Sequence, residues 1–296
     1  METLCNKFDR MNELISAGQA AQTSILLMGY LGAMRERSDI WPTAVSALRS
    51  HPLHEQLLGD PFNRRCFEKP RGYAGDAKMI DLIYHREAPE GTSGVGQDLF
   101  SVTLDFQTAE AVRLRRDLAE KELLNAHKAG KRILSLACGH FREGAQLTGK
   151  NLENITLVDQ DPLSLAVVRK EHGDNVNIEE ANVIRFLRQA SKCGERWDYI
   201  YTLGLTDYFD EQVMRLFHQL LAKVLAPEGN ILLANFVPDH LSIGWMEAVM
   251  DWHLVYRSEA DLARHARAAG FAPKTWIDET GCIAYCRMTH REAPAL

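Results

Sequence analysis

The second half of the chain alternates between short apolar runs and segments in which apolar residues recur every three or four positions. The apolar runs predict strands near residues 133–137, 154–159, 176–178, 197–202 and 230–236, with helices between them. Strand-helix units with short connections indicate a mostly parallel sheet covered by helices on both faces. Two further runs, 274–277 and 282–288, predict a closing hairpin with an antiparallel final strand. The pattern as a whole predicts an α/β fold with seven strands.

The first half of the chain shows helical periodicity instead. Trp41-Pro42 suits the start of a helix, and Asp76 is placed to cap another after a glycine loop. The expected helices are 14–28, 41–53, 76–83 and 98–127. We therefore expect two parts: a helical region over residues 1–128, and the sheet domain over residues 129–296.

Composition narrows the classes of protein to consider. The 296 residues carry a net charge of −6, with 46% hydrophobic and 25% charged residues, which is ordinary for a globular protein and disfavours nonspecific binding to nucleic acid. No apolar run is long enough to span a membrane, and the first residues lack the apolar core of a secretion signal. The six cysteines form no C-x-x-C pair, and no His/Cys/Asp cluster suggests a metal. We expect a cytoplasmic protein with reduced thiols and no stable membrane insertion.

The segment Arg132–Gly144, RILSLACGHFREG, organises the sheet domain. An apolar strand breaks at Cys138-Gly139, and polar residues and helical spacing follow. A strand, a glycine turn and a helix together place a ligand at the carboxyl end of the strand. The segment is not a dinucleotide fingerprint, because Phe141 occupies the position of the second glycine, and it is not a P-loop, because no Gly-Lys-Ser/Thr follows. An ordinary strand-turn-helix remains the alternative.

Asp159 ends the second strand, twenty residues after Gly139. A carboxylate at this spacing suits the two hydroxyls of a ribose, because it accepts two hydrogen bonds from a vicinal diol. The alternative role for Asp159 is a helix cap, although Asp161 is the stronger candidate for that role. Asn182, after the third strand, has two interpretations that stay open, an adenine contact and a cap.

The turn at Gly139 resembles motif I of class I S-adenosylmethionine-dependent methyltransferases, in which LACGxGxxxG-like sequences are common. His140 stands where many members have a small residue or proline. The acid at the end of the second strand and the closing hairpin add to the resemblance. Three further stretches, Lys69–Asp76, Asn235–Pro238 and Asp251–Arg257, resemble a bacterial subgroup similar to the 3-hydroxypalmitic acid methyl ester synthases, from about residue 65 onward.

The resemblance implies a Rossmann-like class I methyltransferase fold with S-adenosyl-L-methionine as the cofactor. Residues 1–128 would form a helical lid or substrate-capping region. Arg71 and Tyr73 would belong to this lid over the cofactor, with Arg71 on its methionine carboxylate; a helix-capping turn with a surface arginine is the alternative. The expected cofactor contacts are Arg71, Tyr73, Ala137, Cys138, Gly139, Asp159, Gln160, Asn182, Val183, Thr202, Leu203 and Gly204.

Methyl transfer from a sulfonium is an in-line displacement, so the protein mainly aligns donor and acceptor and excludes water. A carboxylate acceptor needs no base, and Arg71 or Arg257 would hold it. A hydroxyl, amine or carbon acceptor benefits from a histidine base, for which His140, His240 and His253 are candidates. The catalytic candidates are His140, Tyr208, His240 and Arg257. Aromatic residues expected near the acceptor are Tyr208, Trp245, Trp252 and Tyr256; core packing along one helix face is the alternative for the last two.

The sequence therefore predicts a methyltransferase for a small or lipid-like metabolite, with carboxyl O-methylation as the leading hypothesis. An N-, S- or C-methyltransferase of a small natural-product precursor is the alternative. A nicotinamide or flavin oxidoreductase is disfavoured by the missing fingerprint, and a noncatalytic binding partner with the same fold is disfavoured by Gly139 and Asp159. A homodimer is left open.

Overall fold

The computed structural model describes residues 4–173 and 175–291, which divide into two compact units. The first comprises the residues up to Arg113 together with Asp239–His253, and the second comprises Leu114–Pro238 together with the residues from Leu254 onward. The division therefore falls inside one helix rather than at the expected boundary of 128/129. It also assigns a segment that follows the fifth strand to the helical unit.

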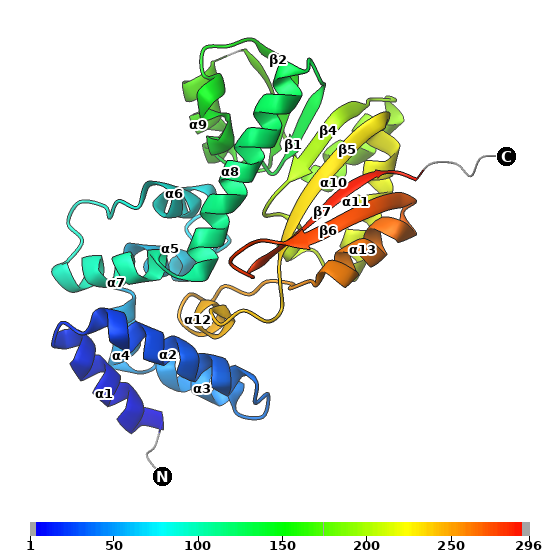
Figure 1. The fold of residues 1–296 in the computed structure, drawn as a ribbon. Coiled ribbons are helices and arrows are strands. Elements are labelled where there is room, and N and C mark those ends of the chain that lie inside the picture. Colours follow the sequence, from blue (N-terminus) through cyan, green and yellow to red (C-terminus); the bar gives the residue numbers. More distant parts are fainter. Residues whose placement is uncertain (1–3, 174, 292–296) are drawn as a thin grey trace. The chain divides into compact units, whose positions relative to one another are not determined.

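The first unit is helical (Figure 1). Its helices are α1 (Leu4–Ser16), α2 (Ala20–Arg35), α3 (Trp41–Arg49), α4 (Pro52–Leu57), α5 (Pro61–Glu68), α6 (Ala77–His85), α7 (Gly94–Leu104), the start of α8 (Gln107–Lys128), and α12 (Ile243–Ala248). Local sequence determines where several of these helices begin. Pro42 lies in the first turn of α3, as expected. The Asp76 carboxylate accepts the Met79 N–H at 2.8 Å and caps α6, also as expected.

Buried polar contacts explain why the segment Asp239–His253 belongs to the helical unit. The Glu247 carboxylate accepts hydrogen bonds from Arg35 Nε at 2.9 Å and from Trp41 Nε1 at 3.0 Å. Trp245 is fully buried, donates from Nε1 to Asn63 Oδ1 at 3.1 Å, and packs edge-on against Phe106. These partners lie about 140 to 210 positions earlier in the chain, so periodicity alone could not have placed the segment.

The second unit is a seven-stranded sheet in the order β3-β2-β1-β4-β5-β7-β6. Its strands are β1 (Ile133–Leu136), β2 (Leu152–Asp159), β3 (Val176–Glu180), β4 (Trp197–Thr202), β5 (Leu225–Phe236), β6 (Phe271–Ile277) and β7 (Ile283–His290). The pairs among β1 to β5 are parallel, and β7 runs antiparallel between β5 and β6. The predicted fold, including the closing hairpin and the N-terminal helical region, is confirmed.

Helices connect these strands and cover the sheet (Figure 1). They are α9 (Pro162–His172), α10 (Val183–Lys192), α11 (Glu211–Val224) and α13 (Glu259–Ala268), with short 3-10 turns η1 (Arg142–Leu147) and η2 (Thr206–Tyr208). Residues of α10, α11 and α13 share one apolar cluster with β1, β4 and β5. The β2-α9-β3 and β4-α11-β5 crossovers run in opposite directions from β1 and β4, so right-handed crossovers place α9 and α11 on opposite faces.

Some element boundaries differ from the sequence prediction. The long helix expected over 98–127 is two helices, because the chain turns at Asp105-Phe106, where Phe106 is buried against Trp245. The helix expected after Gly139 is the short η1, and Leu152 already belongs to β2. Residues 251–258 are not helical, so the alternative interpretation, in which Trp252 and Tyr256 pack along one helix face, is wrong. None of the helices described is long and apolar enough to cross a membrane.

Candidate functional site

The turn after β1 has an unusual backbone. Ala137, Gly139 and Phe141 have φ angles of +56°, +53° and +52°, so left-handed residues alternate along the turn. Glycine adopts this conformation at little cost, whereas alanine and phenylalanine are strained by it. Strained residues of this kind cluster at ligand sites, where surrounding contacts hold them in place. The backbone thus supports the sequence-based placement of a ligand site at Gly139.

Asp159 ties this turn to the end of β2. Its Oδ2 accepts the Gly139 N–H at 2.8 Å, and its Oδ1 accepts the Asp161 N–H at 2.9 Å. Burial raises the pKa of the Asp159 carboxyl, while these backbone hydrogen bonds act in the opposite direction. Each carboxylate oxygen has a further lone pair, so the group can still accept hydrogen bonds from a ligand. Gly139 and Asp159, predicted to act together, are in direct contact.

The neighbouring strand ends carry further polar groups. Asn182 Oδ1 accepts the Ile184 and Arg185 N–H groups and caps α10, so the capping interpretation of Asn182 is confirmed. Its Nδ2 lies 3.5 Å from Gln160 Oε1, which brings the ends of β2 and β3 together. Val183, the first residue of α10, is buried. Asp161 caps α9 through the Leu163 N–H at 3.0 Å, as the sequence predicted.

The strand order reverses between β1 and β4, because β2 and β3 lie beyond β1 and β5 lies beyond β4. Ligands of open α/β sheets bind at such a point, outside the carboxyl ends of the strands. Thr202 ends β4 with its Oγ1 buried, and no hydrogen-bond partner for it is found in the described ranges. Leu203 and Gly204 follow, and Tyr208 in η2 is partly exposed. Cys138 lies at the β1 side of this point, and burial raises the pKa of its thiol well above the ordinary value.

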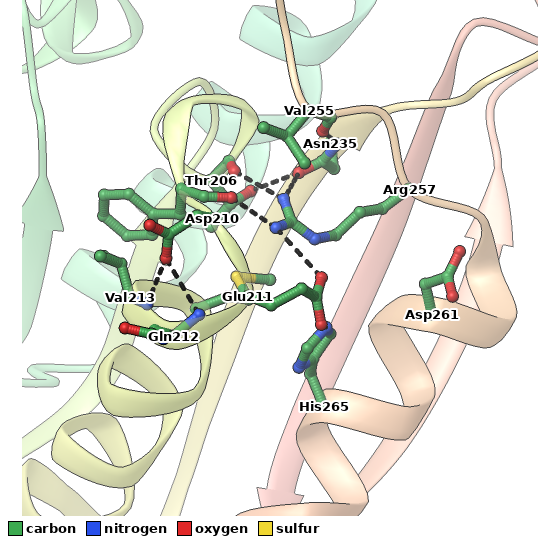
Figure 2. A network of polar contacts seen from close by, with 12 residues as sticks. Thr206, Asp210, Glu211, Gln212, Val213, Asn235, Val255, Arg257, Asp261 and His265 are labelled. Atoms are coloured by element: carbon green, nitrogen blue, oxygen red, sulfur yellow. Dashed lines mark hydrogen bonds and ion pairs between the residues drawn. The ribbon is translucent and has the colours of Figure 1, made fainter.

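Arg257 is buried, and its guanidinium group forms hydrogen bonds within the protein (Figure 2). Its Nη1 donates to the Thr206 carbonyl at 2.8 Å and its Nη2 donates to the Phe209 carbonyl at 2.5 Å. Nη1 also lies 3.3 Å from Asn235 Oδ1, and Glu211 is within ion-pair distance of Nη2. The guanidinium therefore joins η2 to β5, and the expectation that it holds an acceptor carboxylate is corrected, because both terminal nitrogens are engaged in these bonds.

The histidine candidates differ in their surroundings. His140 is buried, and its Nδ1 lies 3.5 Å from Arg142 Nη2. His240 belongs to the helical unit, and burial lowers its pKa to about 4. His253 is exposed, with Nε2 3.2 Å from the Asp251 carboxylate. Of the three, only His140 lies on the turn that carries Gly139.

Arg71 and Tyr73 lie on the loop between α5 and α6, in the helical unit. The loop is held by the Gly72 N–H, which donates to the Lys69 carbonyl at 2.8 Å. It is also held by two bonds of 2.8 Å from Arg65 to the Asp76 carboxylate. Asp76 is thus a structural residue of this loop. The contribution of Arg71 and Tyr73 to cofactor binding stays a prediction.

The fold is similar to solved structures at low sequence identity. A possible exported protein from Bordetella parapertussis aligns with 73% of this chain and 79% of its own length, at 15% identity and a TM-score of 0.55. Magnesium protoporphyrin IX methyltransferase from Synechocystis PCC 6803 with bound SAH aligns over 62% and 87%, at 12% identity and a TM-score of 0.47. An O-methyltransferase family protein from Burkholderia thailandensis aligns over 66% and 60%, at 19% identity and a TM-score of 0.45. No protein-family model matches the sequence, and no curated protein is significantly similar to it. These similarities concern the fold alone.

Three polar residues near the β1 and β4 ends, two buried and one half-buried, escaped the sequence analysis. Tyr201 on β4 donates from its hydroxyl to Glu143 Oε1 at 2.8 Å, and burial raises the pKa of the Glu143 carboxyl. Arg115 on α8 is only 7% exposed and is attracted electrostatically to Glu143 and Asp207. Arg115 stands in a charged stretch, RLRRD, in which spacing alone does not distinguish a buried arginine from its half-buried neighbours.

Proposed function

We propose that the chain is a S-adenosylmethionine-dependent methyltransferase. The observation that carries this proposal is the Asp159 carboxylate, bonded to the Gly139 amide at the edge of the sheet where the strand order reverses. A buried carboxylate that is bonded to a glycine turn and keeps further lone pairs is suited to a ribose diol. The resemblance of the turn to motif I adds independent support from the sequence.

The residues present fit this cofactor. Asp159 would bind the ribose hydroxyls, and Gln160 and Asn182, which lie side by side at the β2 and β3 ends, would flank the adenine. Gly139, Thr202 and Gly204 would face the amino-acid part. When bound, S-adenosylmethionine supplies a methyl group activated by the positive sulfur. The residues of this chain then have to bind the cofactor and the acceptor, orient them for transfer and exclude water. None of these tasks requires a metal.

For the acceptor we propose a small or lipid-like metabolite, with transfer to a carboxylate oxygen as the leading case. A carboxylate is ionised at neutral pH and requires no proton removal. The environment of the histidines agrees with this proposal, because a His240 side chain with a pKa of about 4 is a weak base at neutral pH. Since Arg257 is engaged within the protein, Arg71 is the remaining arginine of the two proposed for the acceptor. The helical unit would cap the substrate.

The alternative is an N-, S- or C-methyltransferase of a small natural-product precursor, for which His140 would be the base. His140 follows Gly139 directly and is the only histidine candidate on that turn. A noncatalytic protein with this fold would bind the cofactor without transferring its methyl group.

The decisive experiment incubates the pure protein with methyl-tritiated S-adenosylmethionine and a metabolite extract, and then isolates labelled small molecules. We expect a labelled product that mild alkali hydrolyses, as a methyl ester would be. A labelled product stable to alkali would favour the N-, S- or C-methyl alternative. Cofactor binding in calorimetry without any labelled product would favour the noncatalytic protein, and absence of binding would refute the proposal.

The pH dependence of single-turnover rates separates the two kinds of acceptor. With a carboxylate acceptor and no base, the rate should stay nearly flat from about pH 6 to 9. With an unperturbed histidine base, it should fall as the pH drops through about 6.5. A base at His240 would move that fall to about pH 4. An acid limb that disappears in a His140→Gln variant would overturn the carboxylate proposal and identify the base.

A further inference from the structure

Arg115 is a buried arginine. Within the described part of the chain, its guanidinium group forms no hydrogen bond or ion pair. Its residue is 7% exposed, and it lies on α8 within the unit that begins at Leu114. Arginine stays protonated in proteins and carries five N–H donors. Burying such a group costs free energy unless an acceptor, preferably an anion, compensates it. The position of the guanidinium therefore indicates where an anion is to be expected.

The guanidinium faces the turn that follows β4. A Cβ atom built on Gly204 would lie 3.5 Å from Nη1, 3.6 Å from Nη2 and 3.8 Å from Cζ of Arg115. The similar distances place the flat group against the position that a side chain of residue 204 would occupy, and glycine leaves this position free. Gly204 comes two residues after the end of β4, which pairs with β1. Arg115 thus lies at the same edge of the sheet as the Gly139 turn.

The two nearby acids are engaged elsewhere. Asp207 Oδ1 accepts the Phe236 N–H at 2.8 Å, and Glu143 Oε1 accepts the Tyr201 hydroxyl at 2.8 Å. Both attract Arg115 electrostatically, but neither forms an ion pair with it in the part of the chain that the structure describes. Burial also raises the pKa of Asp207 to about 6, which weakens it as a counterion near neutral pH. The N–H donors of Arg115 are therefore not used in hydrogen bonds to these two acids in the described structure.

We propose that Arg115 binds the carboxylate of the amino-acid part of the cofactor. This inference rests on the proposed function. If Asp159 binds the ribose at the β2 end and the adenine lies toward β3, the amino-acid part extends across the β1 turn toward β4, where Gly204 and Arg115 lie. The carboxylate is the only anionic group of S-adenosylmethionine, and a guanidinium can bind it with two parallel hydrogen bonds. Arg115 thereby takes the role that the sequence analysis assigned to Arg71.

The test compares the binding of two ligands to two forms of the protein by calorimetry, with no methyl acceptor present. S-adenosylhomocysteine and its decarboxylated analogue, in which hydrogen replaces the carboxylate, are titrated into the wild-type protein and the Arg115→Gln variant. We expect the wild-type protein to bind the analogue about 10- to 100-fold more weakly than S-adenosylhomocysteine, the usual effect of losing hydrogen bonds to a charged group. Arg115→Gln should lose a similar factor toward S-adenosylhomocysteine and little toward the analogue.

Two variants serve as controls. Lys121→Gln removes a positive charge from an exposed position on the same helix and should leave both affinities unchanged. Arg115→Lys should recover part of the affinity for S-adenosylhomocysteine, because a lysine restores the charge but not the paired bonds. The comparison of the two ligands on the wild-type protein remains valid even if Arg115→Gln does not fold.

The outcomes separate this inference from the proposed function. If the wild-type protein binds both ligands equally, or if Arg115→Gln weakens both ligands to the same extent, Arg115 does not bind the carboxylate and the inference is overturned while the methyltransferase proposal stands. If the wild-type protein binds neither ligand, the proposed function itself fails and this inference fails with it.

Discussion

Replacing Asp159 by asparagine tests the part of the site on which the proposed function depends. The Asp159 carboxylate uses both oxygens: Oδ2 for the Gly139 N–H and Oδ1 for the Asp161 N–H. An asparagine can keep one of these bonds, but its NH₂ group then faces the second N–H, which loses its acceptor. The residue is only 6% exposed, so water replaces that acceptor poorly.

The expected magnitudes follow from these two bonds. One buried N–H without an acceptor costs about 1–3 kcal/mol in the free energy of unfolding. For a domain of this size, that corresponds to a decrease in melting temperature of about 2–4 °C for each kcal/mol. Loss of the charged partner of the ribose hydroxyls should weaken S-adenosylhomocysteine binding by a further 1–3 kcal/mol, or about 5- to 150-fold. Asp159→Ala leaves both amides without an acceptor. It should therefore lower the free energy of unfolding and weaken S-adenosylhomocysteine binding more than Asp159→Asn does.

Asp210→Asn is the matched control for Asp159→Asn. Asp210 caps α11 by accepting the Gln212 and Val213 N–H groups on the same atom, Oδ1, at 2.9 and 2.8 Å. An asparagine oxygen can accept both bonds, so this variant should keep nearly normal stability and binding. Calorimetry and thermal unfolding of the variants check the prediction. Wild-type affinity in Asp159→Asn would refute the ribose assignment, and a lower melting temperature with unchanged affinity would reduce Asp159 to a structural residue of the turn.

Three further predictions concern other parts of the molecule. Arg257→Met should lower the free energy of unfolding by about 3–5 kcal/mol, because buried carbonyls lose their donors, whereas the exposed Arg264→Met should change it by less than about 0.5 kcal/mol; urea unfolding would show the difference. Burial lowers the pKa of His218 to about 4, so between pH 6.5 and 4 the unfolded chain binds a proton that the folded chain does not. The free energy of unfolding should therefore decrease as the pH is lowered through that window. His218→Gln should show a smaller fall in the same urea titrations, and an equal fall would contradict the assignment. Amide hydrogen exchange over residues 69–76 should slow when S-adenosylhomocysteine is added, if this loop orders over the cofactor; equal exchange with and without the ligand would make the loop purely structural.

Local patterns in the sequence predicted the strands of the sheet, the starts of some helices and the pairing of Gly139 with Asp159. The strands of the sheet are short apolar runs, and the starts of α6 and α9 follow from Asp76 and Asp161, because a cap depends on atoms only a few residues apart. The contact of Gly139 with Asp159 was also predictable, because parallel neighbours align their carboxyl ends and the spacing between two such ends is nearly constant.

Only the tertiary structure decided the roles of the buried charges and the assignment of the segment after β5. Arg257 and Arg115 look alike in the sequence, yet Arg257 is bonded to the carbonyls of η2. Arg115 lies beside Gly204 and, within the described residues, interacts with Glu143 and Asp207 only through longer-range electrostatics. Trp245 was expected near the acceptor, but it lies in the core of the helical unit beside Asn63. The physical reason is the same in each case: the partners are separated by about fifty to nearly two hundred residues, and hydrophobic periodicity records whether a position is buried but not which distant group it meets.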